Sequence, residues 1–94
     1  MTTLMVRLRV ADYDAWRPQY DGAMERARGV VRSYRVWRGQ DDRNLVLTEE
    51  TFDSREVAEA LLANPAIQQE MEEHGVEPSS VQFDWLDEVG GETR

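Results

Sequence analysis

The stretch from 12 to 29, DYDAWRPQYDGAMERARG, constrains the fold most because its hydrophobic residues recur at helical spacing. They lie three or four residues apart and so share one helix face: Tyr13, Trp16, Tyr20, Met24 and Ala27. Asp12 stands where an N-cap belongs. Since proline disrupts a helix interior, we expect a short turn over 12–16, then a main helix with Pro18 in its first turn. Gly29 should end that helix in a left-handed conformation.

The segments on both sides of this helix have strand character. Residues 4–10, LMVRLRV, alternate in hydrophobicity, which predicts a half-buried strand. Residues 30–38, VVRSYRVWR, are rich in β-branched and aromatic types and predict a second strand. The polar run 39–44, GQDDRN, predicts a hairpin loop, and 45–52 predicts the third strand.

The second half of the chain predicts a further helical region and a last strand. Asp53 followed by Glu56 resembles a capping box, and the next turns would bury Val57, Leu61 and Leu62. Asn64–Pro65 breaks this helix and caps a new one, which presents Ile67, Met71 and His74 on one face up to Gly75. Residues 81–89 alternate again, so they predict a half-buried strand.

The order strand, helix, strand, strand, helix, strand predicts an α+β, ferredoxin-like (βαββαβ) fold. Residues 1–94 would form one domain, with a four-stranded antiparallel sheet, helices on one face, an ordered core at about 4–89 and a frayed tail at 90–94. The other sheet face would be bare. Hydrophobic residues assigned to that face are Met5, Val30, Tyr34 and Val36, so we expect a second copy to cover it in a symmetric homodimer.

The composition limits the partners. The formal net charge is −8, with 19 acidic and 11 basic residues, which argues against a nucleic-acid binder. The chain has no cysteine, so disulfides and thiolate chemistry are excluded and a cytoplasmic location is expected. Arg7 and Arg9 interrupt any signal-peptide-like run, and no segment approaches the roughly 20 apolar residues of a membrane span.

Candidate functional residues come mainly from the helices. Trp16, Tyr20 and Met24 could line a pocket for a flat hydrophobic ligand, or could simply be core. His74 is the first candidate for proton transfer, although a histidine in the last helical turn also suits the helix dipole. One histidine without cysteine argues against a transition-metal site. No glycine-rich phosphate loop is present, so a nucleotide cofactor is not indicated.

The strands supply further candidates. Tyr34 could donate a hydrogen bond to a substrate oxygen, or could pack at the dimer seam. Met71, Phe83 and Trp85 are the remaining candidates for ligand contact. Five arginines on the first two strands could form cross-strand ion pairs with Glu49 and Glu50, or one could turn into the pocket and bind a phenolate: Arg7, Arg9, Arg32, Arg35 and Arg38.

Three runs carry a resemblance to a known family: VADYDAWRPQYD, GQDDRNLVLTEETFDSREVAEALL and NPAIQQEMEEHGVEPSSVQFDWLDEV. Over about residues 4–89 the chain resembles the dimeric α+β barrel superfamily, and within it the antibiotic biosynthesis monooxygenase-like proteins. The resemblance implies a dimer of packed sheets and a pocket between sheet and helices in each subunit. It also implies small aromatic ligands and, for the oxygenases, no cofactor.

The haem-degrading branch of that superfamily fits poorly. It pairs an Asn on the first strand with a Trp near the end of the third strand and a His on the following helix. This chain has no Asn in 4–10, has Phe52 near the Trp position, and carries its histidine later, at His74. Two hypotheses follow: a cofactor-independent monooxygenase, isomerase or cyclase acting on a hydrophobic, polyketide-like substrate with His74 and Tyr34 in catalysis, or a dimer that binds or assembles without turnover.

Overall fold

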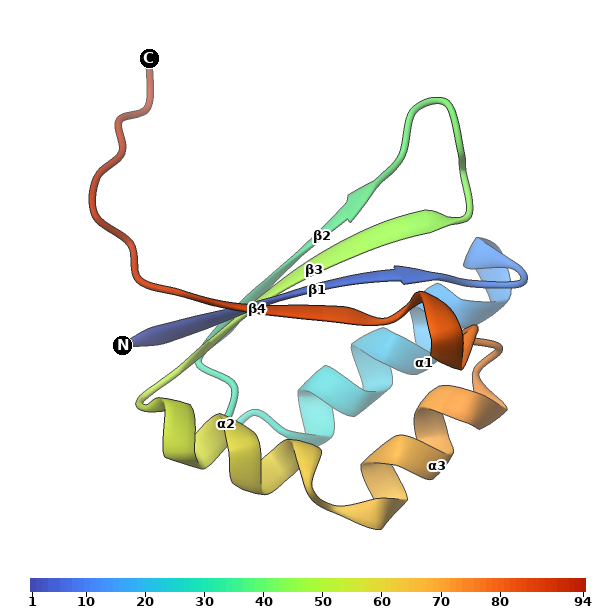
Figure 1. Cartoon of the computed structure of the whole chain (residues 1–94), viewed down its shortest axis with the longest axis horizontal. Helices are drawn as coiled ribbons and strands as arrows, with labels where there is room; N and C mark the ends of the chain where they lie inside the picture. The colour runs from blue at the N-terminus through green and yellow to red at the C-terminus, as the bar shows by residue number, and fades with distance from the viewer.

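The computed structural model describes residues 1–94 as one antiparallel sheet with three helices on one of its faces (Figure 1). The elements follow the predicted order, including the new helix predicted after Asn64–Pro65, and a 3-10 turn is added before the last strand. They are β1 (Thr2–Arg9), α1 (Tyr13–Arg26), β2 (Ser33–Arg38), β3 (Leu45–Phe52), α2 (Arg55–Leu62), α3 (Pro65–Glu73), a 3-10 turn (Pro78–Ser80) and β4 (Gln82–Leu86). The strand order is β2-β3-β1-β4. The predicted ferredoxin-like fold is confirmed.

The register of the two central strands decides which side chains face the helices. Val6 of β1 lies opposite Thr48 of β3, and Leu4 lies opposite Glu50. These four side chains are buried, because alternate residues of paired strands point to the same face. The core between sheet and helices contains Leu4, Val6, Leu8, Val10, Trp16, Val31, Val46, Phe52, Ala58 and Val76.

The predicted composition of the other sheet face is partly wrong. Tyr34 lies opposite Glu50 and Val36 lies opposite Thr48, so both belong to the helix side. Val30 precedes β2 and packs against the core. The helix-free face instead carries Met5, Trp37, Leu45, Leu47 and Leu86, with Arg7, Arg9, Arg35 and Glu49 between them. We refer to these nine residues as the outer face.

Helix α1 is continuous, which corrects the prediction of a short turn followed by a second helix. Asp12 is its N-cap, and the Asp12 side chain accepts a hydrogen bond from the Asp14 amide at 3.0 Å. Pro18 lies inside the helix. The helix ends at Arg26 with Ala27 as its C-cap, and Gly29 has no positive φ, so its predicted left-handed role is wrong.

The N-cap of α2 differs from the prediction, whereas the N-cap of α3 agrees with it. Ser54 caps α2 and accepts a hydrogen bond from the Val57 amide at 3.3 Å. Asp53, predicted as that cap, instead binds the Arg32 guanidinium through both carboxylate oxygens, at 3.0 and 2.7 Å. Asn64 caps α3 ahead of Pro65, as predicted.

None of the three helices has the length and apolarity needed to cross a membrane.

Two glycines are required by the backbone. At Gly39, in the β2–β3 hairpin, a Cβ atom would lie 2.4 Å from the Asp42 carbonyl oxygen. Gly75 follows α3 with φ at +79°, a conformation that side chains other than glycine rarely adopt. It directs the chain from α3 back to β1, where the Ala11 amide donates to the Gly75 carbonyl oxygen at 2.9 Å.

Candidate functional site: a cavity between sheet and helices

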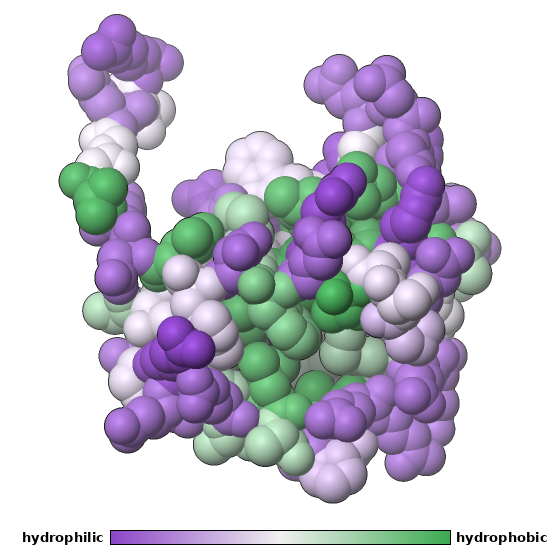
Figure 2. Space-filling model, in the orientation of Figure 1, coloured by the Kyte–Doolittle hydropathy of each residue, from purple (hydrophilic) through white to green (hydrophobic).

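A cavity of about 300 Å³ lies between the helix-covered sheet face and the helices. Fourteen of its nineteen lining residues are hydrophobic, so it suits an apolar ligand. Figure 2 shows hydrophobic residues gathered across the middle of one side of the molecule, between sheet and helices, with hydrophilic residues around them. The lining residues are Val6, Leu8, Trp16, Tyr20, Ala23, Met24, Arg26, Ala27, Val30, Thr48, Glu50, Leu61, Leu62, Ile67, Glu70, Met71, His74, Val76 and Phe83.

Six of the eight candidate residues line this cavity. Trp16, Tyr20 and Met24 come from α1, Met71 and His74 from the α3 side, and Phe83 from β4. Trp16 and Tyr20 form a stacked pair with ring centroids 4.8 Å apart. The aromatic face of α1 therefore forms one wall of a cavity and is not packed throughout against the sheet.

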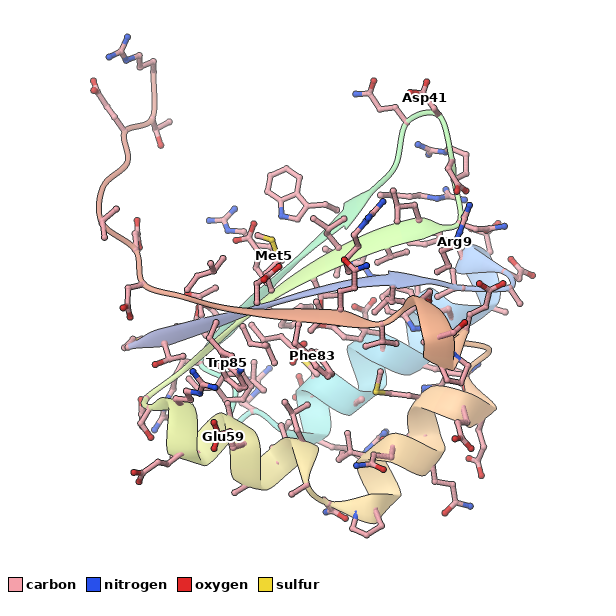
Figure 3. All side chains as sticks on the ribbon, viewed as in Figure 1. Met5, Arg9, Asp41, Glu59, Phe83 and Trp85 are labelled. Carbon is pink, nitrogen blue, oxygen red and sulfur yellow. The ribbon has the colours of Figure 1, made fainter.

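Tyr34 and Trp85 lie outside the lining. Tyr34 packs edge-on against Tyr20 at a centroid distance of 5.8 Å, and its hydroxyl lies 3.4 Å from an Asp21 carboxylate oxygen. Trp85 lies under the Arg55 guanidinium, 4.7 Å from the ring centroid. Figure 3 shows Phe83 and Trp85 extending from β4 toward the helices, while Met5 and Arg9 extend to the other side of the sheet.

The sheet side of the cavity carries a small polar cluster: Glu50, Thr48 and Tyr20, referred to below as the polar floor. Glu50 is 8% exposed, and the Thr48 hydroxyl donates to its Oε2 at 3.3 Å. Burial raises the pKa of the Glu50 carboxyl, and the neighbouring hydroxyls of Thr48 and Tyr20 offset only part of that effect. No arginine forms a salt bridge with Glu50.

The Tyr20 hydroxyl is buried and has no hydrogen-bond partner of normal geometry, although Thr48 and Glu50 lie beside it. Burial raises the pKa of Tyr20, and the Glu50 charge raises it further. A buried hydroxyl without a partner costs free energy, because it has lost its bond to water.

The exposed margin of the cavity is charged. Arg26 of α1 and Glu70 of α3 form a salt bridge at 3.2 Å, and both line the cavity. His74, the C-cap residue of α3, lies one turn beyond Glu70. Its imidazole makes no hydrogen bond within the chain, so it is free to bind a ligand or water.

The proposed cross-strand ion pairs are not formed. Arg9 pairs with Asp42 and Arg32 pairs with Asp53, so these arginines contact loop aspartates. Glu49 instead accepts a hydrogen bond from the Trp37 indole at 2.8 Å. None of the five strand arginines lines the cavity.

Sequence reasoning missed Glu50, and the signal was present in the strand pattern. Residue 50 shares its parity with Val46 and Phe52 in LVLTEETF, so it had to face the same side as the core residues. Its neighbour Glu49 faces the other side of the sheet. No group of three or more His, Cys, Asp or Glu side chains is arranged to hold a metal ion.

Comparisons with known proteins identify the fold. No protein-family model matches the sequence, and no curated protein matches it. Solved structures do match: an antibiotic biosynthesis monooxygenase-like protein from Deinococcus radiodurans has a TM-score of 0.72 at 14% identity, over 100% of this chain and 98% of that one. The fold is that of the antibiotic biosynthesis monooxygenase-like proteins.

Two further structures support this assignment. A protein of the same description from Chloroflexus aurantiacus matches with a TM-score of 0.70 and 21% identity, over 98% of this chain and 96% of that one. SnoaB, a cofactor-independent oxygenase from Streptomyces nogalater, matches with a TM-score of 0.74 and 10% identity, over 96% and 94%. At these identities the similarity establishes the fold and leaves the chemistry to the site.

Proposed function

We propose that this chain is a small-molecule enzyme that takes a hydrophobic, aromatic, polyketide-like substrate into the cavity between α1, α3 and the sheet. The observation that carries the proposal is the cavity itself: about 300 Å³, with aromatic and aliphatic walls and few polar groups. That size lies at the lower end of the range for small-molecule sites and suits two or three fused rings. The shared fold with a cofactor-independent oxygenase favours oxygenation without a cofactor over isomerisation or cyclisation.

In this proposal the walls bind the rings. Tyr20, stacked on the buried Trp16 ring, offers aromatic contact, and Met24, Met71 and Phe83 supply adaptable apolar contact. His74 remains a candidate for proton exchange at the exposed margin. Tyr34 and Trp85 have no ligand contact in this scheme, because neither lines the cavity.

We further propose that the protein acts as a homodimer in the cytoplasm. The outer face exposes Trp37 (53%) and Leu86 (40%) next to other hydrophobic residues, and a second copy would cover it. The absence of cysteine fits a reducing compartment.

Filling the cavity tests the proposal. Ala23 lines the cavity from α1, so Ala23→Phe should occupy ligand space and weaken the binding of 1-naphthol, measured by calorimetry, by at least about tenfold. Ala60→Phe is the matched control, because Ala60 is exposed on α2 and does not line the cavity. Equal affinity in the wild type and Ala23→Phe, with both folded, would contradict the assignment of this site.

Turnover is tested with anthrone, a three-ring ketone with an acidic CH₂ group. An oxygenase would convert anthrone and O₂ to anthraquinone and water, followed by absorbance against a buffer blank. A rate that falls in Ala23→Phe and stays unchanged in Ala60→Phe supports an enzyme. Binding without turnover of anthrone or related hydroxylated ketones would favour the alternative, a ligand-binding dimer without catalysis.

A further inference from the structure

The polar floor is the one part of the cavity whose chemistry the hydrophobic walls do not explain. An apolar site for a purely apolar ligand has no need of a carboxyl that is 8% exposed or of a buried hydroxyl without a partner. Each of these groups reduces stability where it lies, since buried polar groups are normally paired. Both residues line the same cavity, so one bound molecule can lie against both.

The position of Glu50 suits a general base. It sits on a central strand, held between Leu4 on β1 and Tyr34 on β2, and fixed further by the hydrogen bond from Thr48. A carboxylate on a rigid strand, removed from water and without a cationic partner, is a stronger base than one in solvent. Tyr20 next to it can donate its free hydroxyl proton in a hydrogen bond to a substrate oxygen.

Resting on the function proposed above, we infer that Glu50 is the catalytic base and Tyr20 the oxyanion donor for a substrate with an acidic C–H next to a carbonyl. Glu50 Oε takes the proton, so the C–H bond breaks and an O–H bond forms on the carboxyl. The electron pair of the C–H bond becomes the enolate, and the Tyr20 hydroxyl holds the enolate oxygen. Return of a proton from Glu50 completes an exchange that needs no oxidant; attack by O₂ on the same enolate would begin an oxygenation.

Glu50 on the sheet side of the cavity, and not His74 at its margin, is the base in this assignment. His74 lies at the exposed end next to the Arg26–Glu70 salt bridge, where water can reach it. Glu50 faces the interior, where the walls exclude water and an enolate would be protected from unproductive protonation. The residues next to Glu50 are uncharged: Leu4 and Tyr34 lie opposite it on the neighbouring strands, and Thr48 and Tyr20 lie beside it. The charged or titratable residues that line the rest of the cavity are Arg26, Glu70 and His74, from α1 and the α3 side.

The test uses 2-tetralone in D₂O, with exchange of its acidic C–H protons followed by NMR. We expect the wild type to accelerate exchange over buffer, and Glu50→Gln to lose roughly 100-fold or more of that acceleration. Tyr20→Phe should lose roughly tenfold or more, because one enolate donor is removed. Glu49→Gln is the matched control, because Glu49 is the adjacent residue on the outer face and bonds Trp37 instead.

A pH profile separates a catalytic from a structural role. The wild-type rate should rise with pH as Glu50 loses its proton, and Glu50→Gln should lack this rise while still binding 2-tetralone. Glu50→Asp keeps the carboxylate one methylene further back, so it should retain the rise at a lower rate.

The outcomes distinguish this inference from the function on which it rests. Wild-type protein that binds 2-tetralone without accelerating exchange overturns the inference and leaves the cavity as a binding site. Exchange that survives in Glu50→Gln and disappears in His74→Ala also overturns it, in favour of the histidine. Failure of 1-naphthol and 2-tetralone to bind at all overturns the proposed function itself.

Discussion

The burial of Glu50 has a cost in stability that depends on pH. Its pKa is raised in the folded chain, so the folded state keeps this proton to a higher pH than the unfolded state does. Between the two pKa values the folded state binds more protons, and stability therefore falls as pH rises through that window. Glu50→Gln has no charge to bury, so we predict a higher Tm than wild type at about pH 8, with a difference that shrinks near pH 4, below the usual Glu pKa of about 4.3.

Thermal denaturation at several pH values measures this difference, and each 1 kcal/mol corresponds to roughly 4–8 °C in a domain of this size. Glu49→Gln serves as the control, since Glu49 is only half-buried and shows no comparable environment. A Glu50→Gln variant that is less stable than wild type at high pH would mean that the carboxylate is compensated by contacts absent from this structure.

At the scale of elements, Pro18 in the middle of α1 is the residue least suited to its place. It lacks the amide that would bond the Asp14 carbonyl oxygen, yet the helix continues on both sides from Tyr13 to Arg26. We predict that Pro18→Ala raises the free energy of unfolding by about 1–3 kcal/mol, measured by urea denaturation. Because Trp16 and Tyr20 flank this position and line the cavity, the same variant should alter 1-naphthol affinity.

Gly22→Ala is the matched control in the same helix. It adds helix propensity of about 0.5–1 kcal/mol without restoring a hydrogen bond, and its Cβ would lie 3.4 Å from the Arg26 side chain. Pro18→Ala should therefore stabilise the chain more than Gly22→Ala does. An equal or smaller effect would show that surrounding contacts already offset the missing hydrogen bond.

The elements that sequence reasoning predicted well are those whose signals are local. The 45–52 strand matches β3 residue for residue, and the Asn64–Pro65 boundary matches the start of α3, because alternation and proline geometry depend on neighbours in the chain. The cap of α2 was misplaced because Arg32, distant in sequence, binds Asp53 and leaves the capping position to Ser54. A local pattern contains no information about such a partner.

In the site too, the features set by local spacing could be predicted, and those set by tertiary packing could not. Helical spacing placed Trp16, Tyr20 and Met24 on one face, and the structure confirms that they share a surface. Spacing could not decide whether this surface was packed or hollow, because that depends on how far α1 and α3 stand from the sheet. Strand alternation groups residues by face without saying which face the helices cover, and this is why the prediction for Tyr34 is wrong. Glu50 differs, because its parity with Val46 and Phe52 already indicates the buried face.

At the scale of the whole molecule, the outer face is the feature that a single chain leaves unexplained. Leu47 at its centre lies opposite Arg7 on β1 and Trp37 on β2, so hydrophobic and charged groups alternate across a surface that no helix covers. In a two-fold dimer, the outer faces of two copies would lie against each other. The arginines of one copy would then lie near acidic groups of the other, such as Glu49 and Asp84. The free energy of such a contact comes mainly from the hydrophobic centre.

We therefore predict a dimer in sedimentation equilibrium at micromolar concentration, and a shift toward monomer in Leu47→Arg. The substitution places a charge at the centre of the face, where a buried and unpaired charge costs several kcal/mol. Since the cavity lies on the helix-covered side of the sheet and Leu47 lies on the outer face, folded Leu47→Arg should still bind 1-naphthol. Arg43→Leu in the β2–β3 hairpin loop is the control and should leave the dimer intact. A monomeric wild type would contradict the proposed assembly, whereas a monomeric variant that loses ligand binding would show that the cavity needs the partner to keep its shape.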